Sequence, residues 1–245
     1  MKYFFLIFVI LTLLSLVGCS ALQRKFLFYP SHHDSSNGLT AWKLGDRVIG
    51  YAREVDGPEN VWLMLHGNGG QASDRAYALP CFSARDSIYI LEYPGYGRRA
   101  GAPSRASFDE AALEAYLLLR KSFPKIPVCV VGESLGTGPS SMLASQSPAP
   151  DKIVLVTPFD KLTRVAADHF PLLPVGLILG KTWDNSRALT AYKGPIEIFG
   201  AKEDQIIPVN HAQALAASLP SARFHLIEGG HNDWSQEGRV IIRNP

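Results

Sequence analysis

The stretch Val128-Cys129-Val130-Val131-Gly132-Glu133-Ser134-Leu135-Gly136 carries the strongest structural signal in this 245-residue chain. An apolar, β-branched segment leads into the pattern Gly-x-Ser-x-Gly, and the small-residue run from Thr137 to Ala144 follows. This order predicts a buried strand, a tight turn and a helix. The turn forces its central residue into a strained backbone, so we expect Ser134 Oγ to stand clear of the sheet as a nucleophile. The flanking glycines fit because strand and helix pass too close there for a Cβ.

Length and composition indicate one globular domain that can bury a full core. Apolar residues make up 47% of the chain and charged residues 19%, values typical of globular proteins. The net charge of +2 is too small to indicate nucleic acid or an acidic polymer as a partner. The sequence also contains no basic run, internal repeat or low-complexity tract.

The N-terminal residues predict a membrane tether. After Met1-Lys2, the nearly unbroken apolar run from Tyr3 to Val17 is shorter than the about 20 residues of a membrane span and suits a signal peptide. It ends in Leu16-Val17-Gly18-Cys19, which resembles the lipobox of bacterial lipoproteins. That resemblance implies cleavage after residue 18, lipidation of Cys19 and, because Ser20 follows, anchoring to the outer membrane facing the periplasm. An uncleaved anchor with an incidental cysteine is the alternative.

Two further cysteines, Cys81 and Cys129, are expected to be free. Cys129 lies within the strand that leads to Ser134, where a free cysteine behaves as a small buried hydrophobe. A disulfide would require a close approach of the two Cα atoms that no sequence pattern indicates.

Continuous apolar runs predict further strands that are buried on both faces. They alternate with helical patterns, of which Ser107 to Phe123 and Val209 to Leu219 are the clearest, the former with a possible capping box of Ser107 and Glu110. This alternation predicts an α/β fold with a mostly parallel sheet and a binding site beyond the carboxyl ends of its strands. The strand candidates are Arg47 to Val55, Val61 to Leu65, Ile88 to Leu91, Val128 to Val131, Ile153 to Val156, Ile196 to Phe199 and Phe224 to Ile227.

A serine nucleophile needs a base that is oriented by a third group. His231 follows a predicted strand on a glycine loop, and Asp204 also follows a strand. The chain order Ser134, Asp204, His231 is that of α/β-hydrolases. Glu203 is the competing acid, and an N-cap role is the alternative for Asp204. His211 and His225 lie within helical and strand patterns, which favours structural roles.

The tetrahedral intermediate needs two N–H donors aimed at its oxyanion. The amide of Leu135, which starts the helix after the nucleophile, is one candidate. The other is the amide of Asn68, which directly follows the pair His66-Gly67 in a glycine-rich loop. His66 is interpreted as a residue that fixes this loop, and a merely flexible loop is the alternative.

Six segments together resemble the small serine hydrolases of the α/β-hydrolase superfamily, in the serine-aminopeptidase-like branch that is related to membrane-associated depalmitoylating hydrolases. The resemblance implies an eight-stranded, mostly parallel sheet with flanking helices and a short cap, and neither a metal nor an organic cofactor. Two departures are Glu92, where an aspartate is usual, and Arg98-Arg99 after a Gly-Tyr-Gly turn, which either alter the site entrance or form a solvated surface pair. The segments are Leu65 to Gly70, Glu92 to Gly97, Gly132 to Gly136, Thr157 to Asp160, Asp204 and Gly230 to Asp233.

The segment from Asp160 to Asn185 lies where this fold usually inserts a cap. Its apolar part, from His169 to Leu179, has two interpretations: a short lid that accepts an acyl chain, or a helix packed on the core after two prolines. The cap is too short to enclose a large substrate, so we expect an open site.

These patterns predict residues 1–18 as signal peptide, 19–36 as lipidated cysteine and lead-in, and 37–245 as the hydrolase domain. The predicted function is hydrolysis of carboxylic esters or thioesters of acyl substrates through an acyl-enzyme on Ser134. A peptidase or amidase with the same triad is one alternative. A lipoprotein scaffold without turnover is the other, and the intact triad argues against it.

Overall fold

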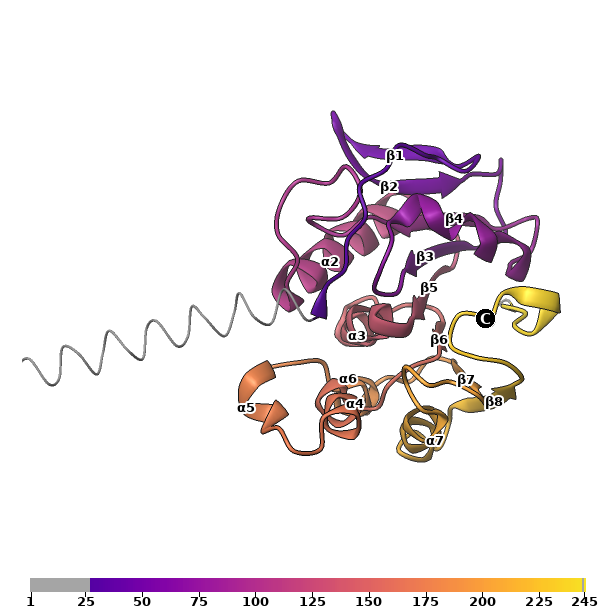
Figure 1. The fold of residues 1–245 in the computed structure, drawn as a ribbon. Helices are drawn as coiled ribbons and strands as arrows, with labels where there is room; N and C mark the ends of the chain where they lie inside the picture. Colours follow the sequence, from indigo (N-terminus) through magenta and orange to yellow (C-terminus); the bar gives the residue numbers. More distant parts are fainter. Residues whose placement is uncertain (1–26, 244) are drawn as a thin grey trace, which may run out of the picture.

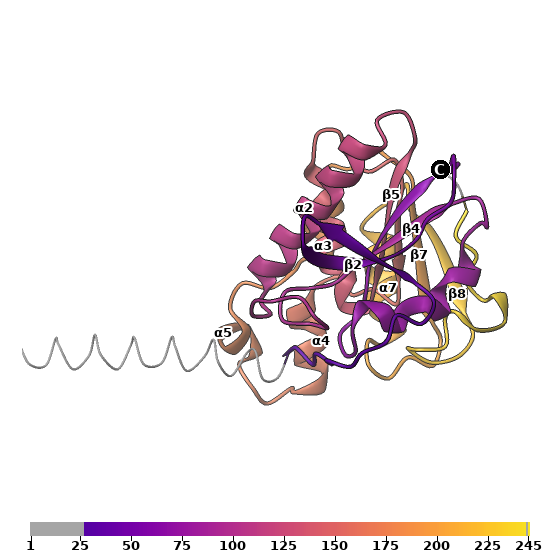
Figure 2. The ribbon, with the colours of Figure 1, turned by 90° about the horizontal axis from the view of Figure 1, so that it is seen from above.

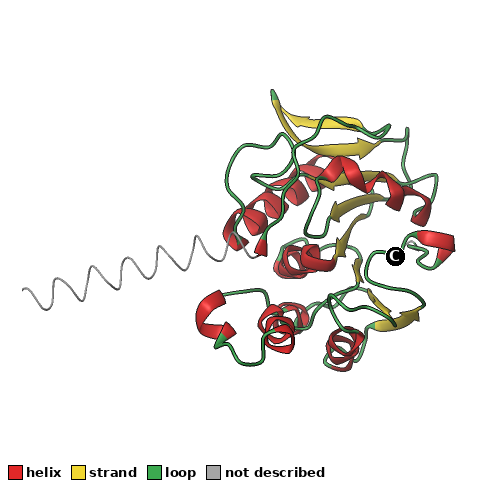
Figure 3. Ribbon diagram, viewed as in Figure 1, coloured by secondary structure: helices red, strands yellow, loops and turns green. Residues whose placement is uncertain are grey.

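The computed structural model describes residues 27–243 and 245, so the predicted signal peptide and Cys19 lie outside the described residues. Strands and helices alternate along the chain (Figures 1 and 3). The strands are β1 (Thr40–Leu44), β2 (Arg47–Arg53), β3 (Val61–Leu65), β4 (Ser87–Leu91), β5 (Val128–Glu133), β6 (Ile153–Val156), β7 (Ile196–Ala201) and β8 (Arg223–Ile227). The helices are α2 (Arg105–Ser122), α3 (Thr137–Met142), α4 (Leu162–His169), α5 (Val175–Leu179), α6 (Asn185–Leu189) and α7 (Val209–Ala217), with short 3₁₀ helices η1 (Ala72–Cys81), η2 (Ser134–Gly136), η3 (Leu143–Ser145) and η4 (Gln236–Gly238).

The eight strands form one sheet in the order β1-β2-β4-β3-β5-β6-β7-β8. β2 pairs antiparallel with β1 and β4, and all other neighbouring strands are parallel. The predicted mostly parallel, eight-stranded fold is therefore confirmed. Because β5 is central, its carboxyl end with Ser134 lies in the middle of one edge of the sheet.

Both faces of the sheet are covered, which explains why its central strands read as unbroken apolar runs. In β3, Leu63 packs with α2 on one face, whereas Trp62 and Met64 pack with η1 and the C-terminal segment on the other. Figure 2 shows the sheet between these two layers, with α2 and α3 on one side. This alternation of side chains is the period of two of a strand.

Two features differ from the sequence-based expectation. β1 was not predicted, because it is an edge strand with a single buried residue, Trp42, and no apolar run. The long helix α2 begins at Arg105 and not at Ser107, because Ser104 is its N-cap and Ser107 is the N3 residue of the capping box. The possible box of Ser107 and Glu110 is thus wrong. Ser104 Oγ accepts the Ser107 amide at 3.0 Å.

Both cysteines among the described residues are free and buried. Burial raises the pKa of the Cys81 thiol to about 11. Burial also raises the pKa of the Cys129 thiol, to about 12, which keeps both thiols protonated and unreactive at neutral pH. Among the described residues, no helix is long and apolar enough to cross a membrane.

The cap consists of α4, a linking loop and α5. Only Leu179 of α5 is buried, while Leu172 and Leu177 are 95% and 84% exposed. The interpretation of this segment as a helix packed on the core is therefore wrong for most of its length. Pro171 and Pro174 keep the segment between α4 and α5 out of a helix, so α5 begins only at Val175. The apolar side chains of this segment therefore do not pack on the core.

Candidate active site

The structure places Ser134 in the strained turn that the sequence predicts. Its φ of 51° lies in the left-handed region, which a residue with a Cβ rarely adopts. A Cβ at Gly136 would lie 2.6 Å from the His66 carbonyl oxygen, and one at Gly132 would lie 2.8 Å from the Gly136 carbonyl oxygen. Both glycines are thus required by close packing. Ser134 is 8% exposed, at the floor of a cleft.

Ser134, His231 and Asp204 form a continuous hydrogen-bonded chain. Ser134 Oγ lies 2.7 Å from His231 Nε2, and His231 Nδ1 lies 2.6 Å from Asp204 Oδ2. Because a carboxylate only accepts, Nδ1 carries the hydrogen and Nε2 is left to accept from the serine hydroxyl. The three residues come from loops after β5, β7 and β8, which parallel pairing brings to one edge of the sheet.

Asp204, and not the competing Glu203, contacts the imidazole. The amides of Ile206 and Ile207 donate to Asp204 Oδ1 at 2.9 and 2.8 Å, which leaves Oδ2 for the histidine. Asp204 is also not a helix N-cap, because Pro208 holds that position in α7. Glu203 is exposed.

Asn68 lines the same cleft as Ser134 and His231. Its side chain is fixed: Oδ1 accepts from Tyr96 Oη at 2.8 Å and from the Tyr29 amide at 3.0 Å, while Nδ2 donates to the Leu27 carbonyl oxygen at 2.6 Å. Leu135 directly follows Ser134 in η2, so its backbone amide lies beside the candidate nucleophile. Two backbone amides beside a nucleophile, from Leu135 and from the loop that contains Asn68, suit an oxyanion hole.

Glu133, next to the candidate nucleophile, holds the loop of residues 66–70, here called the Asn68 loop, in place. Sequence reasoning missed this role. Its Oε2 accepts the Gly67 amide at 3.0 Å and lies 3.1 Å from Arg75 Nε, and Tyr77 Oη donates to Oε1 at 2.8 Å. Arg75 in turn donates to the carbonyl oxygen of Gly69 at 2.6 Å. Burial alone would raise the pKa of Glu133, but Arg75 and the hydrogen bonds outweigh it and lower the pKa.

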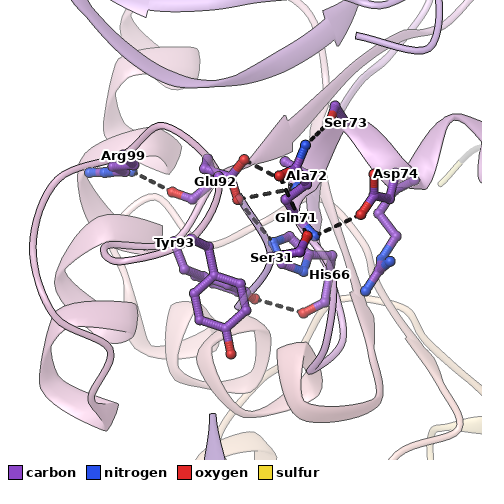
Figure 4. Close-up of polar contacts among 12 residues, drawn as sticks. Ser31, His66, Gln71, Ala72, Ser73, Asp74, Glu92, Tyr93 and Arg99 are labelled. Carbon is purple, nitrogen blue, oxygen red and sulfur yellow. Dashed lines mark hydrogen bonds and ion pairs between the residues drawn. The ribbon is translucent and has the colours of Figure 1, made fainter. Parts of the chain in front are cut away.

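His66 and Glu92 brace the loop from its other side (Figure 4). His66 is fully buried, its Nδ1 lies 2.8 Å from the Gly67 carbonyl oxygen, and its Nε2 lies 3.7 Å from Glu92. Tyr93 Oη donates to the His66 carbonyl oxygen at 3.0 Å, and Glu92 accepts the Ala72 amide at 3.1 Å. These contacts agree with the interpretation of His66 as a loop-fixing residue.

The two arginines after the Gly-Tyr-Gly turn do not line the cleft. Arg98 is an exposed partner of Asp34 at 2.7 Å. Arg99 donates to the Glu92 carbonyl oxygen at 2.9 Å and pairs with Glu114 at 2.9 Å. Arg99 therefore supports the turn, and only Arg98 fits the interpretation as a solvated surface residue.

His211 is buried away from the triad. Its ring nitrogens lie 2.8 Å from Asp160 and 2.9 Å from Asp168. The ring thus joins α7 to the loop after β6 and to α4, which is a structural contact. The described residues contain no group of three or more His, Cys, Asp or Glu side chains that could hold a metal ion.

The doubly covered sheet, the strained serine turn and the Ser-His-Asp chain define the class of α/β hydrolases. A model of the alpha/beta hydrolase family matches residues 62–236, and the chain belongs to this family.

Known proteins similar to this chain support the assignment. An uncharacterised protein of Mycobacterium tuberculosis is 31% identical over 240 residues, with 90% of this chain and 84% of that protein covered. The lysophosphatidylserine lipase ABHD12 of Xenopus tropicalis is 26% identical over 211 residues, with 76% of this chain covered. The match covers 54% of the lipase, so this chain spans about half of its length.

Solved structures share the fold at low sequence identity. A Thermus thermophilus protein has a TM-score of 0.63 at 18% identity, with 82% of this chain and 93% of that chain covered. A Pyrococcus furiosus esterase also has a TM-score of 0.63, at 14% identity, with 86% and 92% covered.

Proposed function

We propose that this protein is a serine hydrolase that cleaves carboxylic esters or thioesters of acyl substrates. The observation that carries the proposal is the unbroken chain from Ser134 Oγ through His231 to Asp204 at the floor of an open cleft of about 810 Å³. The esterase and lipase names of the similar proteins favour an acyl ester as substrate.

The reaction follows from this geometry. His231 Nε2 takes the proton of the Ser134 hydroxyl as Oγ attacks the acyl carbonyl carbon, and Asp204 stabilises the resulting imidazolium. The amides of Asn68 and Leu135 stabilise the oxyanion. His231 then protonates the leaving alcohol or thiol, and an acyl-enzyme remains. Water activated by the same histidine attacks the acyl-enzyme and releases the acid.

We also propose that the protein is tethered outside the cytoplasm through a lipidated Cys19, at the outer membrane facing the periplasm. The support is the sequence Leu16-Val17-Gly18-Cys19-Ser20 after an apolar run. Lipidation of this cysteine requires the mature protein to start at residue 19. Its intact mass tests the tether, with the Cys19→Ser variant, which lacks the acceptor thiol, as the control without acyl chains: the absence of acyl chains from the unmodified protein would contradict it.

Hydrolysis of p-nitrophenyl esters of increasing acyl length tests the proposed activity. We expect Ser134→Ala to reduce kcat by at least about 10³-fold with little change in thermal stability, because the hydroxyl is the nucleophile. Ser141→Ala is the matched control, since Ser141 is a buried serine on α3 that donates to the Thr137 carbonyl oxygen. Turnover that survives in Ser134→Ala would show that another residue is the nucleophile.

A further inference from the structure

The cap exposes an uncharged apolar segment. Residues 170–180, here called the cap loop, contain no charged side chain, and most of them are exposed. Leu172 is 95% exposed, Leu177 84%, Phe170 56% and Leu173 51%. These side chains all lie within eleven consecutive residues. Exposed apolar side chains that gather in this way are uncommon on a soluble monomer, and they mark a contact surface.

The cap loop adjoins the rim of the candidate active site. His169, the last residue of α4, has its Nε2 2.8 Å from the Ile206 carbonyl oxygen. Ile206 is 52% exposed and lines the cleft, as does Tyr29, which is 56% exposed. Apolar surface thus occurs both on the cap loop and at the mouth of the cleft that holds Ser134.

A positively charged hollow adjoins the cap loop. Gly176 and Gly180 line a hollow of about 900 Å³ together with Arg105, Lys161, Lys181 and Arg187, and Asp184 is the single acidic residue among the described residues that line it. Asp184 pairs with Lys161 at 3.6 Å, and Arg105 pairs with Asp109 at 3.4 Å. The side chains of Lys181 and Arg187 form no ion pair with any described residue, so the hollow carries a net positive charge.

The start of the described chain lies on the same side. In Figures 1 and 2, the segment that begins at residue 27 lies on the side of the molecule that carries α4 and α5. In the proposed mature protein, residues 19–26 precede it, and they include the lipidated Cys19 and the basic pair Arg24-Lys25. A tether that enters here would hold the cap loop towards the membrane.

We propose that the cap loop docks on an anionic phospholipid membrane. Leu172 and Leu177 insert among the acyl chains, and Lys181 and Arg187 contact the headgroup phosphates. Apolar insertion and attraction to anionic lipid together give such surfaces their affinity. The inference deepens the proposed function, on which it rests for its substrate: the cleft, with Ile206 at its rim, would receive acyl lipids from the bilayer.

Quenching by brominated lipids tests the docking without reference to activity. The full chain with Leu177→Trp is mixed with vesicles of phosphatidylglycerol and phosphatidylcholine that carry bromine on their acyl chains. Leu226→Trp is the matched control, because Leu226 is a 53% exposed leucine on β8. We expect the emission added by Leu177→Trp to be quenched and that added by Leu226→Trp to persist. Equal quenching of the two variants, or none, would overturn the proposal.

A separate experiment tests whether the charges of Lys181 and Arg187 contribute to docking. Vesicles of phosphatidylcholine alone, or the double change Lys181→Glu and Arg187→Glu on anionic vesicles, should lower the quenching of Leu177→Trp. Quenching that is independent of both changes would overturn the role of anionic lipid. The full chain could instead self-associate in lipid-free detergent solution and bury the tryptophan of Leu177→Trp. That result, together with no quenching on vesicles, would show that a second copy of the chain occupies this surface and would overturn the proposal.

Turnover separates the docking from the proposed chemistry. The double change Leu172→Ser and Leu177→Ser should leave kcat/KM for a soluble short-chain ester unchanged and lower hydrolysis of vesicle-borne lipid, by up to about tenfold per leucine. Quenching without any turnover would retain the docking and refute the hydrolase. Turnover of vesicle lipid that is unaffected by the leucine changes would retain the hydrolase and refute the docking.

Discussion

Glu133 holds a buried negative charge directly beside the candidate nucleophile. Its carboxylate links the Gly67 amide to Arg75, and Arg75 reaches the Gly69 carbonyl oxygen. Asn68 lies between these two glycines, so the direction of its amide depends on both contacts. Glu133 is therefore a positioning residue: it acts on the oxyanion through the loop and does not touch the reacting atoms.

Glu133→Gln should lower kcat by about tenfold to a hundredfold with little change in KM, because a displaced oxyanion donor affects the transition state more than the bound ester. Steady-state kinetics on one p-nitrophenyl ester measures the separation of kcat from KM. The matched control is Glu197→Gln, since Glu197 is a buried partner of Lys152 at 3.3 Å near the start of β7, away from the cleft.

Loss of a buried ion-pair partner costs about 3–5 kcal/mol of stability, and this cost applies to both variants. A purely structural role for Glu133 would therefore lower the unfolding free energy of both variants and leave kcat intact in both. Equal values of kcat in Glu133→Gln and Glu197→Gln would contradict the positioning role.

The sequence predicted the three residues of the hydrogen-bonded Ser-His-Asp chain but not their supporting groups, for a physical reason. Ser134, Asp204 and His231 each follow a buried strand, and the parallel sheet brings such ends together. Arg75 and Tyr77 come from the 3₁₀ helix η1, which is distant in sequence from Glu133, and no motif indicates that they meet it. A charged residue within an otherwise buried Gly-x-Ser-x-Gly turn was the one available signal, because a buried charge requires a partner.

At the scale of structural elements, the turn between β5 and α3 leaves no room for a Cβ at Gly136. Gly136→Ala would bring a Cβ against the carbonyl oxygens of Leu65 and His66, at the end of β3. We expect it to lower the free energy of unfolding by about 2–4 kcal/mol, since backbone atoms cannot move aside as a flexible side chain does.

Urea denaturation measures this loss. Gly176→Ala on α5 is the matched control, because a Cβ there would meet nothing within 4 Å. Its unfolding free energy should stay within about 0.5 kcal/mol of that of the unmodified protein. Equal stability of the two variants would show that the close packing at this turn does not exclude a Cβ.

The elements that the sequence predicted best are those buried on both faces. β3 and β6 have the predicted bounds because their apolar runs end where the chain leaves the core. β1 lies at the edge of the sheet and α5 projects from the cap, so neither carries a pattern set by burial. Edge position and exposure, rather than length, therefore explain these misses.

For the whole molecule, ionised Glu133 couples stability to pH. The pKa of Glu133 is lowered in the folded protein from its ordinary value of 4.5. Ionised Glu133 therefore stabilises the fold fully above this value, and the stabilisation is lost as pH falls through the lower folded-state pKa. We expect the unfolding free energy to decrease below pH 4.5 less steeply in Glu133→Gln than in the unmodified protein.

Urea denaturation of both proteins over a pH series measures the difference. A steeper decrease in Glu133→Gln would contradict the lowered pKa, and so would parallel curves.

The central claim is that the fold presents one activated serine to the cleft. Labelling of the full chain with a fluorophosphonate probe, followed by peptide mass spectrometry, tests it most directly. We predict one covalent adduct, on Ser134, that is absent in Ser134→Ala, much slower to form in His231→Ala and unchanged in Ser141→Ala. An adduct on another residue, or a folded protein that stays unlabelled, would contradict the account.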